Sequence, residues 1–231
     1  MPRIFTVEKL VLLAQQRADM EEQDFILAPE WLFHLSTAYA ELHSILVESG
    51  MRYFERTQTI ATRADVAAYA LPDDFLSSIA VDRIVNATTN ERRELTELMV
   101  QERNVYTRAG ASESVAFSYV GPDIVLYPTP PASQTYEHLY VPQPKDLNGV
   151  ANNTEVDVVT PDGEAFVLWT MCVLARDKEE SDITSAEHKR SQAEARLREW
   201  SVLRALNNPR RRIVADEDWA YRPGDWRGGW R

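Results

Sequence analysis

The stretch TPDGEAFVLWTMCVLA, residues 160–175, decides the fold of this chain. Its start is typical of a helix, because a threonine side chain can accept a hydrogen bond from a free backbone amide and proline suits the first helical position. The apolar side chains that follow leave almost no polar face. A helix that is apolar on nearly all sides must be buried, so we expect residues 160–175 at the centre of the core.

Cys172 is the only cysteine of the chain and lies within this apolar run. No intramolecular disulfide is therefore possible. A free cysteine among apolar neighbours behaves as a small hydrophobic residue. We therefore predict a buried, unreactive thiol.

Two helices are predicted on the N-terminal side of this central helix. The first follows Thr6, which can cap it, and one of its faces is apolar: Val7, Leu10, Val11 and Ala14. The second runs from Pro29 until Gly50 stops it. Its apolar residues recur at helical spacing: Trp31, Leu35, Ala38, Leu42 and Ile45. We expect the two helices to pack against each other.

Two more helices are predicted from capping boxes, in which a threonine is followed three residues later by a glutamate. One starts at Thr88 and runs to about Asn104. Its inward residues are expected to be Leu95, Leu98 and Met99. The other starts at Thr184 and runs to about Asn207, with a narrow apolar stripe: Ala193, Leu197, Trp200 and Leu203.

Strand patterns occupy the middle of the chain. Residues 54–62 predict one strand, and residues 71–75 then predict a short helical turn with acids at its amino end. From Val115 to Tyr140 apolar residues alternate with polar or small ones, interrupted by a turn at residues 121–123. The economical interpretation is one small antiparallel sheet.

The expected fold class is mainly α (α+β), a helical bundle with a small inserted antiparallel β module and an extended C-terminal arm. The domain boundaries follow from this interpretation. Residues 1–208 form one domain, with the β module at about 105–160, and residues 209–231 form the arm. The segment from Pro142 to Thr160 is long and loop-like, and no placement is predicted for it.

Composition restricts the possible functions. The chain has 231 residues, 44% of them hydrophobic, so it can bury a sizeable core. It carries 36 acidic and 25 basic residues, a net charge of −11, which argues against wrapping or scanning nucleic acid. The longest apolar segment is about half of the roughly 20 residues needed to cross a bilayer. We expect a protein that is soluble, not exported and not membrane-bound.

The C-terminal segment PRRRIVADEDWAYRPGDWRGGWR, residues 209–231, has the opposite charge. It holds six arginines and four acids, whereas residues 1–208 hold 19 basic and 32 acidic residues. Tryptophan and arginine dominate the binding energy of many interfaces, so we interpret the segment as a docking arm for a partner or a neighbouring subunit. Its candidate binding residues are Arg210, Arg211, Arg212, Trp219, Tyr221, Arg222, Trp226, Arg227, Trp230 and Arg231.

Residues that could carry chemistry are few. His34 and His43 are nine positions apart on one predicted helix, a spacing that places no two metal ligands on one face. Asp73 and Asp74 follow a proline, where acids favour a helix start. His138 alternates with two tyrosines and is expected to be an ordinary surface or interface histidine. No phosphate-binding loop, nucleophile elbow or CxxC pair is present, so we expect no enzyme, cofactor or metal.

The order of elements resembles the head-to-tail connector, or adaptor, family of tailed bacteriophages, which includes the tail tubular protein A-like adaptors of short-tailed phages. Two short patterns carry the resemblance most clearly. One is Leu71-Pro72-Asp73-Asp74-Phe75, and the other is the hairpin from Gly121 to Pro131, where an apolar strand ends in a proline-rich loop.

The resemblance implies a structural virion protein, made in the host cytoplasm and located at the head–tail junction. Such proteins form homo-oligomeric rings, commonly of twelve copies, beneath the portal protein ring. DNA passes through the centre without specific binding. The C-terminal segment would grip the portal, and the β module would meet the downstream tail or nozzle protein.

Three alternatives remain open from the residues alone. One is a tail-completion or tail-terminator ring protein, although such folds are usually richer in sheet. Another is a cytoplasmic helical interaction module. The third is a hydrolase that would use Asp73, Asp74 and His138.

Overall fold

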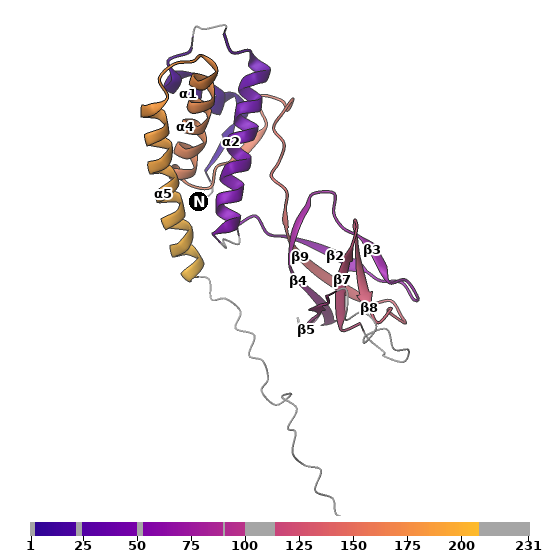
Figure 1. Cartoon of the computed structure of the whole chain (residues 1–231). Helices are drawn as coiled ribbons and strands as arrows, with labels where there is room; N and C mark the ends of the chain where they lie inside the picture. Colours follow the sequence, from indigo (N-terminus) through magenta and orange to yellow (C-terminus); the bar gives the residue numbers. More distant parts are fainter. Residues whose placement is uncertain (1–2, 22–24, 50–52, 90, 100–113, 208–231) are drawn as a thin grey trace, which may run out of the picture.

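The computed structural model describes residues 3–21, 25–49, 53–89, 91–99 and 114–207. In these residues the chain forms a helical lobe and a β lobe, side by side in Figure 1. The chain crosses from one lobe to the other twice, first after the second helix and again after residue 142. All the described helices belong to the helical lobe.

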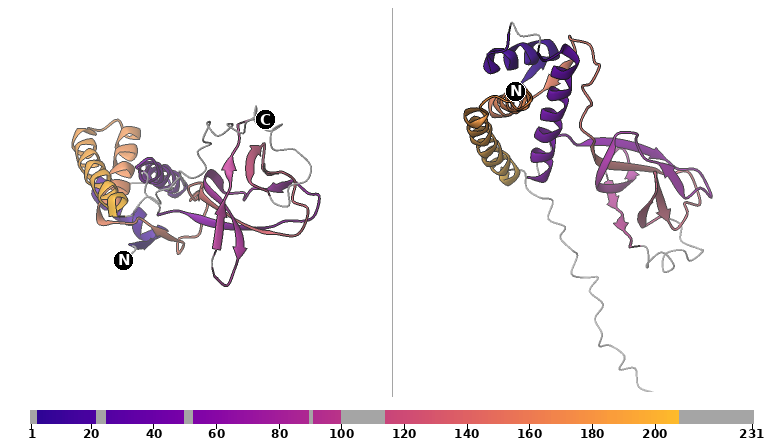
Figure 2. Two further views of the ribbon diagram at one scale, coloured as in Figure 1. Left: turned by 90° about the horizontal axis from the view of Figure 1, so that it is seen from below. Right: turned by 45° about the horizontal axis from the view of Figure 1, so that its top comes forward.

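The helical lobe is built around its third described helix. Its helices are α1 (Val7–Ala18), α2 (Ala28–Glu48), α4 (Pro161–Lys178) and α5 (Thr184–Asn207). Helix α4 lies between α2 and α5 in both Figure 1 and Figure 2, and it also contacts α1. A short two-stranded sheet pairs β1 (Ile4–Thr6) with β10 (Glu155–Asp157). The prediction of a central apolar helix is therefore confirmed.

Local interactions explain where α1 and α4 begin. The Thr6 hydroxyl accepts a hydrogen bond from the Lys9 amide at 3.4 Å, and the Thr160 hydroxyl accepts one from the Gly163 amide at 2.9 Å. A Cβ atom at Gly163 would overlap the Val158 carbonyl oxygen, so only glycine fits this tight entry into α4. The predicted threonine caps of both helices are confirmed.

The β lobe consists of two four-stranded sheets that face each other. One has the strand order β2–β9–β4–β5, with β2 (Arg56–Ala61), β9 (Thr135–Pro142), β4 (Phe75–Asn86) and β5 (Glu91–Glu94). The other has the order β3–β8–β7–β6, with β3 (Ala68–Ala70), β8 (Asp123–Tyr127), β7 (Ala116–Val120) and β6 (Thr96–Glu97). The predicted turn at residues 121–123 joins β7 to β8, with Gly121 at a φ of 61°.

Each lobe has its own hydrophobic core. In the helical lobe, buried residues of α1, α2 and α5 surround the inner residues of α4: Phe166, Val167, Leu168, Met171, Cys172 and Ala175. In the β lobe, both sheets contribute to a second cluster: Ile60, Val81, Leu95, Phe117, Ile124, Leu126 and Tyr136. No described residue belongs to both clusters. The two lobes therefore bury their apolar surface separately.

The predicted fold class is wrong, because the chain is not dominated by a helical bundle. The structure is 39% helical and 28% strand, an α+β fold in which the β lobe is a face-to-face pair of sheets. The strands of the β lobe begin at Arg56, well before the predicted β module. The strand predicted within residues 54–62 is confirmed as β2, but β9 lies in the sheet opposite β7 and β8.

The helix predicted from Thr88 to Asn104 is also wrong, as far as its residues are described. Residues 91–97 form β5 and β6, and between them the chain crosses from one sheet to the other. Leu95, between the two strands, is buried in the β-lobe core, Leu98, directly after β6, is also buried, and Met99 is exposed. Their spacing of three residues is the spacing of a helical stripe. The same spacing also occurs here, where an extended segment passes from one sheet to the other.

The short helical turn predicted at residues 71–75 is a reverse turn. The Phe75 amide donates to the Pro72 carbonyl at 3.0 Å, and Phe75 then starts β4. Strand β4 pairs with β9, which explains why the helix does not continue. No helix among the described residues is long and apolar enough to span a membrane.

Candidate functional site

The predicted arm residues lie outside the described part of the chain. These are Arg210, Arg211, Arg212, Trp219, Tyr221, Arg222, Trp226, Arg227, Trp230 and Arg231. Helix α5, which leads to them, is described to Asn207. The docking role of residues 209–231 therefore stays a prediction. The remaining candidates are the histidines and acids named from the sequence, together with the grooves and exposed apolar surfaces of the two lobes.

His34 and His43 are both buried in α2, each among aromatic rings. His34 lies edge-on to Trp31 at 6.0 Å between ring centroids, and His43 stacks on Phe54 at 4.5 Å. Burial lowers the pKa of both imidazoles. Within the described ranges, no group of three or more histidine, cysteine or acidic side chains could hold a metal ion.

Asp73 and Asp74 do not act as a pair. The Asp74 carboxylate forms an ion pair with Arg56 and accepts a hydrogen bond of 3.0 Å from the Tyr140 hydroxyl. Its carbonyl accepts a 2.6 Å bond from the Gln143 amide. Asp73 is exposed. Asp74 thus holds together the end of β9 and the start of β4, where the chain leaves the β lobe.

His138 is fully buried inside the β lobe, so the expectation of a surface or interface histidine is wrong. Its Nε2 lies 3.2 Å from the Ser78 hydroxyl, and its Nδ1 lies 3.5 Å from the Gln58 side-chain oxygen. Burial lowers its pKa to about 4. The hydrogen-bond partners found for His138 are uncharged, and Asp74 is engaged elsewhere, so the structure does not assemble the hydrolase site.

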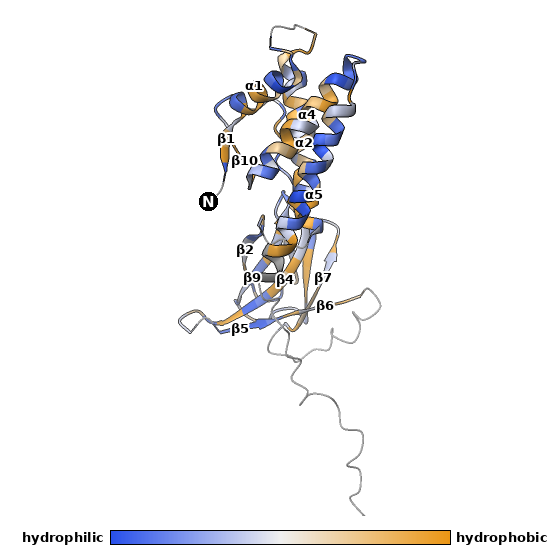
Figure 3. Cartoon of the chain, turned by 90° about the vertical axis from the view of Figure 1, so that its left-hand side faces the viewer, coloured by the Kyte–Doolittle hydropathy of each residue, from blue (hydrophilic) through white to orange (hydrophobic). Residues whose placement is uncertain are grey.

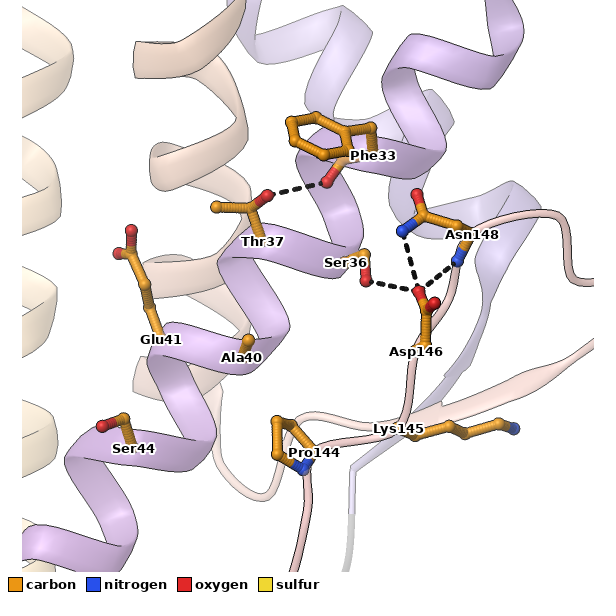
Figure 4. A pocket seen from close by; sticks show the side chains of 10 residues that line it. All are labelled: Phe33, Ser36, Thr37, Ala40, Glu41, Ser44, Pro144, Lys145, Asp146 and Asn148. Atoms are coloured by element: carbon orange, nitrogen blue, oxygen red, sulfur yellow. Dashed lines mark hydrogen bonds between the residues drawn. The ribbon is translucent and has the colours of Figure 1, made fainter. Parts of the chain in front are cut away.

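The segment from Pro142 to Thr160, which sequence reasoning left unplaced, packs along α2. The Ser36 hydroxyl donates to the Asp146 carboxylate at 3.0 Å (Figure 4). The same hydroxyl accepts a hydrogen bond from the Leu147 amide at 3.2 Å. Leu147 itself is fully buried in the helical core. The sequence signal for this anchor is slight, because Leu147 is a single apolar residue flanked by polar residues on both sides.

An open groove of about 590 Å³ lies between α2 and this segment. Figure 4 shows the side of α2 from Phe33 through Thr37 and Ala40 to Ser44 on one side of it, with Pro144 and Asp146 on the other. Phe33 is 59% exposed at one end of the groove. A second cavity, of about 470 Å³, continues between the lobes beside His43 and Asp74.

The outward face of the sheet β2–β9–β4–β5 carries exposed apolar side chains. Tyr136, His138 and Tyr140 of β9 point inward and are buried, so Leu139 and Val141 point outward. Leu76 and Ile79 of β4 are exposed beside them, at two register irregularities. Figure 3 shows apolar and polar stretches side by side on these strands.

The helical lobe has an apolar surface of its own. Phe25, Leu27 and Phe33, at and before the start of α2, are each more than half exposed. Large exposed apolar groups that lie near each other are typical of protein–protein contact surfaces. The helical spacing already leaves Phe33 off the apolar stripe of α2, whereas Phe25 and Leu27 precede the helix, where no periodicity distinguishes exposed residues from core residues.

A comparison with protein families finds one match that covers most of the chain. The family model described as "SU10 adaptor protein" matches residues 10–222. Among curated proteins, the comparison finds no match to the chain.

Proposed function

Because the chain belongs to the SU10 adaptor protein family, a family of phage head–tail adaptors, we propose that it forms a ring between the portal and the tail of a virion. DNA passes through the centre of this ring. The subunit acts as a structural, non-enzymatic connector, located at the head–tail junction.

The observation that carries this proposal is the division into two lobes with separate cores and different exposed apolar surfaces. The helical lobe exposes Phe25, Leu27 and Phe33, and the β lobe exposes Leu76 and Ile79. A ring requires a head-to-tail contact, in which two different surfaces of one subunit meet on its neighbours. A connector additionally needs surfaces for the proteins above and below it.

The proposed partners follow the same division. Residues 209–231 serve as the docking arm, for the portal or for a neighbouring subunit. The β lobe meets the downstream tail or nozzle protein. A ring of twelve copies is the expected stoichiometry from the resemblance.

The acidic body supports a conduit through which DNA moves without binding. With a net charge of −11 for the chain, like charges repel the phosphate backbone. A basic lining would instead hold the DNA and slow its passage.

Mass measurement of the purified full-length protein, alone and mixed with a portal ring, tests the proposal. We expect a discrete complex whose mass corresponds to a closed ring of subunits on the portal. A chain that stays monomeric and does not bind the portal at any concentration contradicts the proposal.

A further inference from the structure

We infer that the two lobes are joined by a hinge, at residue 55 and at residues 144–145, and that closing this hinge brings Asp73 of the β lobe into an ion pair with Lys145. The inference concerns a single subunit and does not rest on the proposed ring. The cavity of about 470 Å³ between the lobes is called the interlobe cavity below. Its walls are formed by α2, the start of β2, the turn before β4 and residues 142–146.

The lobes are packed within themselves and not against each other. The helices α1, α2, α4 and α5 pack on one another, and the strands of the β lobe pack on one another. Within the described ranges, no helix is a main packing partner of a β-lobe strand. Units of one chain that share no large apolar interface are expected to move relative to each other. The two crossings between the lobes therefore decide how they move.

The first crossing changes lobe at one residue. The Tyr53 hydroxyl donates a 2.5 Å hydrogen bond to the carboxylate of Asp157, which belongs to β10 in the helical lobe. Phe54 stacks on His43 of α2, with 4.5 Å between ring centroids. Arg56 already starts β2 of the β lobe. Residue 55 is thus the point at which the chain passes from one lobe to the other.

The second crossing is fixed on both sides of a short gap. On the β-lobe side, the Gln143 amide donates a 2.6 Å hydrogen bond to the carbonyl of Asp74. On the helical side, the Asp146 carboxylate accepts one of 3.0 Å from Ser36 of α2. In the described part of the chain, no hydrogen bond holds residues 144–145 between these two anchors. These two residues can therefore rotate while their neighbours stay in place.

The two hinge points lie next to each other, at one side of the interlobe cavity. Both crossings reach the β lobe close together in Figure 1 and Figure 2. Phe54, Arg56 and Pro144, which flank the hinge points, all line the cavity. Two neighbouring points of rotation define one axis, and a few residues at such points can absorb the movement of a whole domain. Rotation about this axis opens or closes the interlobe cavity.

Two charged side chains that line the interlobe cavity are available to hold it closed. Its charged lining residues are Arg56, Asp73, Asp74, Lys145 and Asp146. Arg56 and Asp74 form an ion pair with each other inside the β lobe, and Asp146 is bonded to α2. Asp73 and Lys145 form no ion pair or hydrogen bond with any described residue. The structure thus shows the open state, in which these two charges face solvent.

Opposite charges on the two sides of the hinge favour closure. Asp73 is exposed on the turn before β4, so it moves with the β lobe. Lys145 is exposed next to the residue anchored on α2, and its side chain extends away from α2 in Figure 4. Closure brings the two charges together, and an exposed ion pair stabilises the closed state only modestly. The hinge therefore stays reversible.

Distances between spin labels on the full-length chain test the hinge. The labels are attached to Ser133→Cys in the β lobe and Ala195→Cys on α5, both exposed positions, and dilution with unlabelled protein removes distances between copies. Cys172 is fully buried and should take up no label in the native protein. We expect two separate distances for this pair. The control pair Glu8→Cys, Ala195→Cys lies within the helical lobe and should give a single narrow distance.

Charge variants test the ion pair. Asp73→Asn and Lys145→Gln, each made separately, should lower the ratio of closed to open molecules about two- to fivefold, the range expected for an exposed ion pair. Exchanging the charges, with Asp73→Lys and Lys145→Asp together, should restore the ratio. Asp65→Asn removes an exposed acid of the β lobe that does not line the interlobe cavity, and it should leave the ratio unchanged.

Each result decides the inference independently of the proposed function. A single distance for the pair 133–195, as narrow as that of the control pair, would show that the lobes form one rigid body and would overturn it. An unchanged ratio in either single-charge variant, or an exchange variant that stays open, would overturn it as well. None of these measurements requires a portal, so their failure leaves the proposed ring standing, and a chain that forms no ring can still show the hinge.

Discussion

The hydroxyl of Ser36 on α2 donates a 3.0 Å hydrogen bond to the carboxylate of Asp146, and the same hydroxyl accepts a 3.2 Å bond from the amide of Leu147. One side chain thus binds two consecutive residues, Asp146 and Leu147, of a segment that lies 110 positions further along the chain. This is the contact that fixes the second crossing between the lobes to the helical lobe.

Substituting Ser36→Ala should lower the free energy of unfolding of the helical lobe by about 1–2 kcal/mol, because the amide of the buried Leu147 loses its acceptor. Urea unfolding followed by circular dichroism measures the change. Ser44→Ala is the control, since Ser44 lies on the same helix, is exposed and bonds only to Glu48 nearby. Equal effects of the two variants would contradict a special role for Ser36.

Gly163→Ala should destabilise the entry into α4, because the new Cβ would overlap the Val158 carbonyl oxygen. Overpacking against backbone costs about 1–3 kcal/mol, and we expect the upper part of this range. Thermal and urea unfolding check it, with Ser185→Ala on the exposed start of α5 as a comparison. A Gly163→Ala protein as stable as the original would show that the turn before α4 relaxes freely.

The two separate cores predict two separable responses to cavity mutations. Leu168→Ala in α4 and Leu126→Ala in β8 each remove a fully buried side chain, at a cost of about 2–5 kcal/mol. Hydrogen exchange with mass spectrometry should then show faster exchange in the helical lobe for Leu168→Ala and in the β lobe for Leu126→Ala. Uniformly faster exchange in both lobes for either variant would show that they unfold as one unit.

The buried His138 should make the β lobe sensitive to acid. Its pKa is lowered by burial from 6.5 to about 4. As the pH falls, the unfolded chain therefore binds a proton at this histidine before the folded chain does. The stability that the neutral imidazole contributes, about 3 kcal/mol, is complete above pH 6.5 and is lost between pH 6.5 and about 4.

The measurement is the slope of the free energy of unfolding against pH over this window. His138→Gln should flatten the slope, whereas His188→Gln, at an exposed position on α5, should leave it unchanged. The pKa values of the buried His34 and His43 are lowered in the same direction. These two histidines therefore leave part of the pH dependence of stability in place in both variants. An unchanged slope in His138→Gln would refute the assignment.

Cys172 should react with thiol reagents only after unfolding. It is fully buried against α1, with its Sγ 3.6 Å from the Ala14 carbonyl oxygen, and burial raises its pKa to about 11. At about pH 8 we expect negligible modification by a disulfide-exchange reagent in the native protein and complete modification in urea. Rapid modification without denaturant would show that α4 opens readily from α1.

Sequence patterns predicted the helical lobe well because its signals are local. The Thr6 and Thr160 caps, the proline near the start of α2 and the apolar run of α4 each depend on residues within one or two turns. These features indicated the positions of α1, α2 and α4, and similar local patterns indicated the strand β2 and the turn at residues 121–123. They also supported the resemblance that the family match confirms.

The β lobe was mostly missed because its signals are not local. Leu95 and Leu98 have the spacing of a helical stripe, and only the tertiary structure reveals that Leu95 lies where the chain crosses from one sheet to the other and that Leu98 directly follows β6. His138 alternates with tyrosines on one face of a strand, a pattern equally typical of an exposed or a buried face. Which face is buried depends on the opposite sheet, whose strands lie elsewhere in the sequence.

By itself, therefore, the sequence determined the apolar central helix, the caps around it and the charge contrast between residues 1–208 and the arginine-rich end. Composition and short-range periodicity contain that information. Only the tertiary structure decided that β4 and β9 pair into a sheet with an outward apolar face, and that Asp146 and Leu147 are tied to Ser36. Such contacts join residues far apart in the chain, and their stability comes from packing and hydrogen bonds that exist only once both partners are in place.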